Sequence, residues 1–158
     1  GYYAWGETET KSDYSMQNYT FYTALPGEMA KWEFIGDEIS GTSYDIAHVK
    51  WGGGAKMPTL AEVEELLNNC CFTAGSYNGV RGNYVTGSNG NSIFLPFAGF
   101  RRDGYLYVEN SPGFYWSGTC STKGNASMAA YFECQNDFRI WLYDLRHYGY
   151  SVRPVKEK

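Results

Sequence analysis

A capped amphipathic helix is the feature that most constrains the fold. Thr59 and Glu62 have the spacing of a capping box, in which each side chain bonds the backbone N–H of the other residue. The apolar residues that follow at helical spacing are Leu60, Val63, Leu66 and Leu67. We therefore predict an amphipathic helix from about Leu60 to Asn69. A shorter helix is predicted over residues 44–49, because the three glycines at 52–54 would end it.

Short strands separated by turn residues are predicted after Cys71. Two hairpin signals are Ser88-Asn89-Gly90-Asn91 and Asp103-Gly104, each between apolar segments. The predicted strands cover residues 83–86, 92–97, 100–101, 105–108, 113–117, 128–134 and 138–142, with a turn at 135–137. With one main amphipathic helix early, and short antiparallel strands and hairpins late, the predicted class is α+β. At 158 residues, the chain is predicted to form a single domain over 1–158.

Aromatic residues are unusually frequent, with 15 Tyr, 9 Phe and 5 Trp. Tyr and Trp offer large contact areas at a small entropy cost, so their excess indicates a recognition surface, although an aromatic β core explains it equally well. The net charge of -4 gives no basic footprint for nucleic acid or for an anionic membrane surface. No apolar run approaches the ~20 residues needed to cross a bilayer. We expect no nucleic-acid partner and no membrane insertion by this domain.

The residues that usually carry catalysis or bind metals are sparse and poorly spaced. The cysteines are Cys70, Cys71, Cys120 and Cys134, and no pair of them has the CxxC spacing of a metal site. A Cys120–Cys134 disulfide and two buried free thiols both remain open. His48 and His147 are the only histidines and lie far apart. We therefore predict no catalytic residues, no metal, no cofactor and no enzymatic activity.

Six short runs occur together in an order that resembles a known family. They are Tyr-Ala-Trp-Gly-Glu-Thr at 3–8, Tyr-Asp-Ile-Ala at 44–47 with Trp-Gly-Gly at 51–53, Met-Pro-Thr at 57–59, Ile-Phe-Leu-Pro at 93–96 with Ala-Gly at 98–99, Tyr-Trp-Ser at 115–117 and Ser-Val-Arg-Pro-Val at 151–155. The chain is similar to the major paralogous domain proteins of gut Bacteroidetes, a branch of the C-type lectin fold related to the formylglycine-generating enzyme. The resemblance implies a compact C-type lectin-like fold whose last strand ends near residues 151–155.

Two properties of related proteins do not carry over. The triplets of calcium-dependent lectins (Glu-Pro-Asn, Gln-Pro-Asp and Trp-Asn-Asp) do not occur, so calcium-mediated glycan binding is not expected. The formylglycine-generating enzyme uses two nearby cysteines around a short Arg-containing stretch, whereas Cys120 and Cys134 are far apart in sequence and Cys70 and Cys71 are adjacent. Its oxidase chemistry is not expected either.

A third property fits residues 138–150. Some proteins of this branch resemble variable proteins of diversity-generating retroelements, which randomise template adenines, commonly in Asn codons, before the terminal Ser-Val-Arg-Pro-Val. Adenine changes alone in an Asn codon can produce most amino acids, including those at Ile140, Leu142, Tyr143, Asp144, Leu145, His147 and Tyr148. Trp141 is not reachable, so the resemblance makes it a fixed anchor. An ordinary C-terminal hairpin of a non-diversified relative would show the same sequence.

These observations predict a ligand-binding surface or display domain of a cell or phage tail, outside the cytoplasm, whose contact face is residues 138–150. Tyr143 and Tyr148 would anchor an unknown protein or glycan ligand, and Asp144 and His147 would set polar specificity. A structural or adhesive module of a larger surface lipoprotein is the alternative, and an enzyme of the formylglycine-generating type ranks last. Because the chain begins at Gly1 without a basic and apolar leader, we expect a mature or trimmed fragment whose targeting segment is missing.

Strand periodicity gives the contact face a testable orientation. Phe138, Ile140 and Leu142 lie on one side of a strand, and Arg139 and Trp141 on the other. Hydrophobicity alone would bury the three apolar residues. The family resemblance reverses this choice, because a randomised position is unsuited to filling a core. We therefore predict that Trp141 points inward and that Ile140 and Leu142 are exposed.

Overall fold

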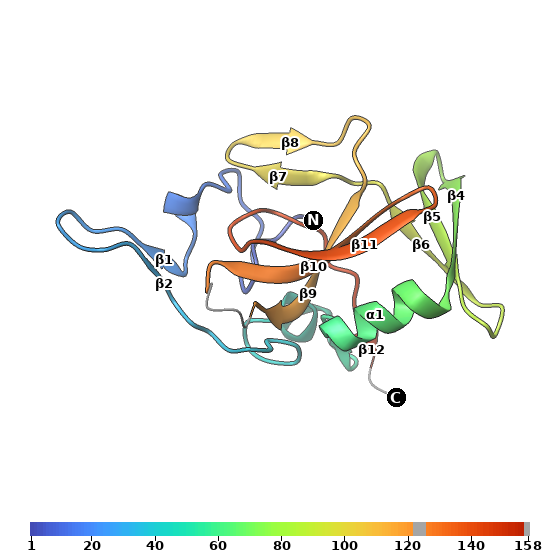
Figure 1. Cartoon of the computed structure of the whole chain (residues 1–158), viewed down its shortest axis with the longest axis horizontal. Helices are drawn as coiled ribbons and strands as arrows, with labels where there is room; N and C mark the ends of the chain where they lie inside the picture. The colour runs from blue at the N-terminus through green and yellow to red at the C-terminus, as the bar shows by residue number, and fades with distance from the viewer. Residues whose placement is uncertain (122–125, 157–158) are drawn as a thin grey trace.

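β-Strands dominate the structure, a computed structural model that describes residues 1–121 and 126–156 (Figure 1). The predicted class, α+β of the C-type lectin type with its helix early and its strands late, is wrong. Strands account for 43% of the chain and helix for 12%, and small sheets include segments on both sides of the one long helix. The class prediction failed because helix is a small share of the chain, and because strands over Ala55–Lys56 and Cys71–Tyr77 add to those that were predicted.

The elements follow one another in chain order. They are η1 (Met16–Asn18), β1 (Tyr22–Thr23), β2 (Lys31–Trp32), η2 (Ala47–Trp51), β3 (Ala55–Lys56), α1 (Leu60–Asn69), β4 (Cys71–Tyr77), β5 (Val80–Thr86), β6 (Ser92–Pro96), β7 (Phe100–Arg102), β8 (Tyr105–Tyr107), β9 (Gly113–Cys120), β10 (Met128–Gln135), β11 (Phe138–Leu145) and β12 (Val155–Lys156). The described part of the chain forms five separate sheets. Two have three strands, in the orders β11-β10-β9 and β4-β5-β6, and three have two strands, β1-β2, β12-β3 and β7-β8.

The predicted helix is confirmed as α1, with both halves of its capping box formed. The Thr59 hydroxyl accepts the Glu62 N–H at 3.2 Å, and the Glu62 carboxylate accepts the Thr59 N–H at 3.2 Å. Thr119 on β9 accepts the Leu60 N–H at 2.9 Å, which ties the start of the helix to the sheet. Its apolar side packs against β9 and β10.

The predicted short helix is found slightly later, as the π-helical turn η2, and it ends at Gly52, whose φ is 61°. Asp45 sets its start. This fully buried carboxylate accepts the N–H groups of Ala47 and Met57, each at 2.8 Å, and that of Gly41 at 2.8 Å. A buried charge with three or more backbone donors is well satisfied, so Asp45 fixes this loop to β3.

The predicted hairpins β5–β6, β7–β8 and β10–β11 are all formed. Asn136 has a φ of 56° in the β10–β11 turn, the left-handed conformation that Asn tolerates. β4 was not predicted, because its sequence does not alternate regularly between apolar and polar residues. It pairs with β5 over its full length, from Cys71 to Tyr77.

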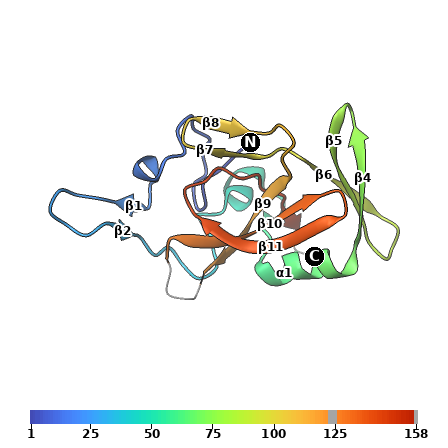
Figure 2. The same cartoon turned by 45° about the horizontal axis from the view of Figure 1, so that its top comes forward.

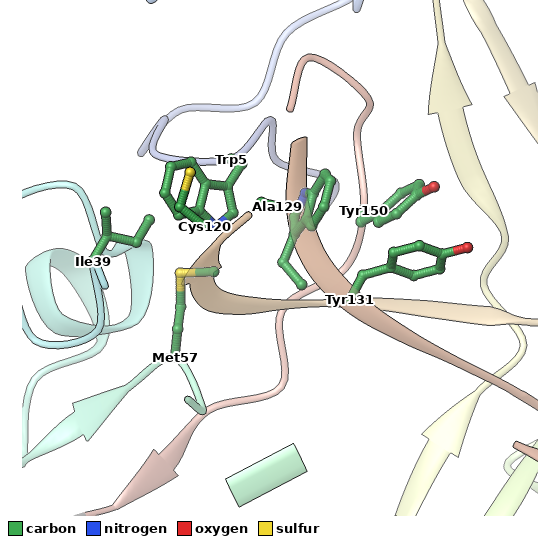
Figure 3. Packing of buried hydrophobic residues seen from close by; sticks show 8 residues of the cluster. Trp5, Ile39, Met57, Cys120, Ala129, Tyr131 and Tyr150 are labelled. Carbon is green, nitrogen blue, oxygen red and sulfur yellow. The ribbon is translucent and has the colours of Figure 1, made fainter. Parts of the chain in front are cut away.

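Two buried clusters hold the small sheets together. One lies between α1 and the near side of β9 and β10, and includes Val63, Leu67, Tyr115 and Phe132. The other fills the far side of the same sheet, and it joins the N-terminal segment to residues near the C-terminus. In Figure 3 the rings of Tyr131 and Tyr150 lie side by side, with both hydroxyls pointing away from the Trp5 end of the core.

Candidate binding face

The side of the β9–β10–β11 sheet that faces away from α1 carries a cluster of aromatic rings centred on Tyr150. The ring centroids of Trp116, Tyr131 and Phe114 lie 4.4, 5.0 and 5.3 Å from that of Tyr150. The β7–β8 hairpin extends this cluster, because Phe100 lies 5.0 Å from Phe114. A backbone bridge between Arg101 and Gly149 fixes the hairpin to the C-terminal segment, with N···O distances of 2.8 Å in both directions.

We call this surface the aromatic face. It comprises Phe100, Tyr107, Phe114, Tyr131, Tyr148 and Tyr150, together with Ile140 and Leu142 of β11. Continuity with β11 follows from the strand register, in which Ile140 lies opposite Glu133 and Glu133 opposite Phe114. Leu142 lies opposite Tyr131 in the same way.

β11 turns its side chains as predicted. Ile140 is 37% exposed and Leu142 is 41% exposed. Trp141 points to the opposite side, where it packs against the α1 cluster, but it is half-buried rather than fully buried. Arg139 shares the side of Trp141, and its Nε donates to the Leu67 carbonyl at 2.9 Å. The exposed apolar residues therefore rest on a strand whose other side is fastened to the helix.

Asp144, Tyr148 and Leu145, three further predicted contact residues, are all half-buried. Asp144 lies on the side of Leu142, where it accepts hydrogen bonds from the Tyr150 hydroxyl and from the Leu145 N–H. Tyr148 is half-buried and belongs to the aromatic face, with its ring 6.3 Å from that of Phe100. Leu145 is half-buried at the end of β11.

Two predicted placements need correction. His147 is buried, only 6% exposed, with its ring 6.0 Å from Trp32 at the base of the β1–β2 hairpin. It cannot act as a surface contact, because the chain turns inward after β11. Tyr143 lies on the side opposite Leu142, at a right angle to Trp141 with ring centroids 5.5 Å apart. The strand period that exposes Leu142 necessarily turns Tyr143 away.

The polar groups of the aromatic face are mostly acidic or hydroxylic. Burial, and then the nearby Asp144 carboxylate, raise the pKa of Glu133 above its ordinary value. Burial likewise raises the pKa of Tyr131 and of Tyr150, so both remain neutral hydroxyls. The Arg102 guanidinium, on the β7–β8 side, lies 5.5 Å from the Tyr107 ring. Such a surface can bind an apolar or cationic group.

Arg146 locks the end of β11 to the N-terminal segment. Its side chain is fully buried, its Nε donates to the Tyr19 hydroxyl at 3.1 Å, and one terminal nitrogen donates to the carbonyls of Glu33 and Ala126 at 2.8 and 2.6 Å. Its guanidinium carbon also lies 5.0 Å from the Trp5 ring. The position of Tyr148 and Tyr150 is therefore set by a buried cation that uses carbonyls and ring faces as partners.

Sequence reasoning missed Tyr131, Tyr150, Phe100 and Glu133 as members of the surface. They come from elements that only the fold brings together. The available signal was alternation: Phe114 with Trp116, and Tyr131 with Glu133, are spaced by two within predicted strands, as expected for residues that share one side.

Two other features could carry chemistry, the cysteines and a hollow beside Glu7. All four cysteines are free thiols, and burial raises the pKa of Cys134 to about 12. No group of three or more His, Cys, Asp or Glu within the described ranges is arranged to hold a metal ion. A hollow of about 460 Å³ lies beside Glu7, but Lys11 and Thr20 already engage that carboxylate, the Lys11 Nζ at 3.0 Å and the Thr20 hydroxyl at 2.8 Å.

No family model matches the chain, and neither a curated protein nor a solved structure is significantly similar to it. Among the residues that the structure describes, no helix is both long and apolar enough to cross a bilayer.

Proposed function

We propose that this chain is a ligand-binding surface or display domain, and that it contacts its ligand through the aromatic face. The observation that carries the proposal is the exposure of Ile140 and Leu142 on a strand whose other side is held by Trp141 and α1. Large apolar side chains that lie together on one exposed side of a strand, instead of packing in the core, favour a binding site.

The composition of the aromatic face supports this role. Protein interfaces are enriched in Tyr and other aromatic residues, which add contact area with few rotatable bonds. Here Tyr107 is 38% exposed, and the neighbouring Tyr105 at the hairpin turn is 67% exposed. The central ring of Tyr150 is buried, so the surface consists of exposed side chains on a fixed aromatic base.

The contact residues follow from these positions. Ile140 and Leu142 would be the anchors, Tyr148 would add aromatic area, and Asp144 would supply the polar contact. His147 would act indirectly, by holding Tyr148 through the edge-to-face contact of their rings at 4.7 Å. The chemistry is binding and not catalysis, and we place the domain on the outside of a cell or on a phage particle.

Diversification by a retroelement is the second part of the proposal, in keeping with the resemblance to variable proteins of the major paralogous domain branch. Its support is that the two exposed candidate positions, Ile140 and Leu142, flank a half-buried Trp141 that adenine changes cannot produce. A reverse transcriptase gene and a near-identical template repeat beside the coding sequence are the expected finding. A locus without them would contradict this part alone.

An adhesive structural module is favoured by one different observation. The β1–β2 hairpin projects from the body of the protein (Figure 1), and Met29 near its tip is 92% exposed. If this hairpin carries the contacts, Met29→Asp will abolish partner binding, whereas substitutions on the aromatic face will not.

Affinity capture distinguishes these possibilities. Purified wild-type domain is immobilised and exposed to the surface fraction of the cells that produce it, beside the double variant Ile140→Asp and Leu142→Asp. The double variant should lose the captured partner. The control Tyr77→Asp, at the opposite end of β4 from the contact between Phe72 and Arg139 and 57% exposed in the wild type, should retain it. Equal capture by all variants would contradict the proposal.

A further inference from the structure

β11 is an edge strand with a free side. In the order β11-β10-β9 it pairs only with β10, as its place at the margin of the sheet in Figure 2 shows. Within the described ranges, no main-chain hydrogen bond outside the β10 ladder involves residues 138–144. In an antiparallel edge strand, every second residue directs its N–H and C=O groups away from its partner. β11 therefore presents a row of backbone donors and acceptors.

The edge carries few of the devices that usually protect such strands. Edge strands are commonly short, or carry Pro, Lys or a bulge that prevents further pairing. β11 pairs with β10 without a register shift from Phe138 to Leu145, and it contains neither Pro nor Lys. Its exposed side chains at alternate positions include Phe138, which is 54% exposed. This combination is typical of sheets that accept an added strand.

We infer that the free edge of β11 binds an extended segment of a partner polypeptide as a fourth strand beside β11-β10-β9. The inference rests on the proposed function, and it names the ligand class. Residues of the added strand that lie opposite Ile140 and Leu142 would be apolar. The residue opposite Asp144 would be Lys or Arg, because Asp144 and Glu133 give this side of the sheet two carboxylates.

Charge disfavours a second copy of this chain as the occupant. Each copy has a net charge of -4. Pairing of two β11 strands would also bring together two α1 helices, because α1 lies against β11 through the bond from Arg139 to Leu67. Within α1 there are three glutamates and no basic residue. Like charges facing each other at such an interface are unfavourable, whereas a segment carrying a basic residue is attracted.

A blocked hexapeptide, Lys-Thr-Val-Thr-Val-Thr, is the probe. Paired antiparallel, it places Lys opposite Asp144 and its two Val residues opposite Leu142 and Ile140. Its binding is measured by titration, from the backbone amide resonances of β11 in wild-type protein. We expect saturable shifts, and affinity about fivefold higher than for the peptide with Glu in place of Lys. Asp144→Asn should remove most of this preference, and Ile140→Lys should abolish binding.

Two N-methylated peptides test strand addition itself. Each peptide carries methyl groups on every second backbone nitrogen. In the first peptide the methyl groups replace the N–H hydrogens that would face β11, and in the second they replace those that would face solvent. Only the first peptide should lose binding. Equal binding of both would overturn strand addition while leaving the aromatic face as the binding site. No movement of β11 resonances with the lysine peptide would overturn the inference, as would a wild-type dimer with protected β11 amides. Retention of a partner in the affinity capture separates these outcomes from failure of the proposed function.

Discussion

Replacing Arg146 with alanine should be among the most destabilising single substitutions in this chain. Among the described residues, the guanidinium makes three hydrogen bonds, to the Tyr19 hydroxyl and to the carbonyls of Glu33 and Ala126. Hydrogen bonds from a charged group contribute roughly 1.5–3 kcal/mol each. Part of this lost stability is recovered, because alanine does not have to bury a charge, whose desolvation costs several kcal/mol. The unpaired carbonyls and the vacated volume remain, so we expect a net loss of about 3–5 kcal/mol.

Thermal and urea denaturation followed by circular dichroism measure this effect. At about 2–4 °C per kcal/mol for a chain of this size, the melting temperature should fall by roughly 10 °C. Arg139→Ala is the matched control, because Arg139 is exposed and its contacts are one backbone hydrogen bond, to Leu67, and the face of the Phe72 ring at 4.8 Å. It should cost about 1 kcal/mol or less. Limited proteolysis of the Arg146 variant should cut first within residues 1–35, which this side chain holds in place.

A melting temperature for Arg146→Ala within 2 °C of wild type would refute the reasoning. It would mean that water replaces the guanidinium at little cost, and that the N-terminal segment is held by its other contacts, such as the hydrogen bond from the Trp5 indole to the Ser117 carbonyl at 2.9 Å.

Three further predictions concern the helix cap, the exposed strand and a buried histidine. Thr59→Ala should cost about 0.5–2 kcal/mol in urea denaturation, whereas Thr59→Ser should cost little, since Ser also caps. Leu142→Ala should cost about 1 kcal/mol or less and Leu67→Ala roughly 2–5, because the first site opens to solvent and leaves no cavity; equal costs would show that Leu142 is buried. Burial lowers the pKa of His147 below its ordinary 6.5, so the stability it contributes is present above that value and is lost as the pH falls through the folded-state pKa. The melting temperature should therefore fall less between pH 7 and pH 5 in His147→Gln than in the wild type. An equal fall in both proteins would mean that other titrating groups cause it.

Local signals predicted most of the secondary structure. The capping box located α1, and turn residues located three hairpins, because both depend on contacts within a few residues. β3 and β4 escaped prediction, because β3 has only two residues and pairs with the distant β12, and β4 does not alternate regularly between apolar and polar residues. The class was wrong for this reason.

The orientation of β11 could be predicted from the period of two and from the expectation, given by the family resemblance, that Trp141 is a fixed residue. The rest of the aromatic face could not be predicted. Tyr150 gathers rings from β7, β9 and β10, and this depends on the bridge between Arg101 and Gly149 and on the buried Arg146. His147 was predicted as a contact because the sequence does not show where the chain leaves the surface after Leu145.

The most direct test of the claim that the aromatic face binds the partner is photo-crosslinking along β11. A photoreactive amino acid is introduced singly at each position from Phe138 to Tyr143, in the cells that produce the protein, and adduct yield is measured after irradiation. Yields should alternate, high at Phe138, Ile140 and Leu142 and low at Arg139, Trp141 and Tyr143. Uniform yields, or high yields only in the opposite phase, would contradict the claim.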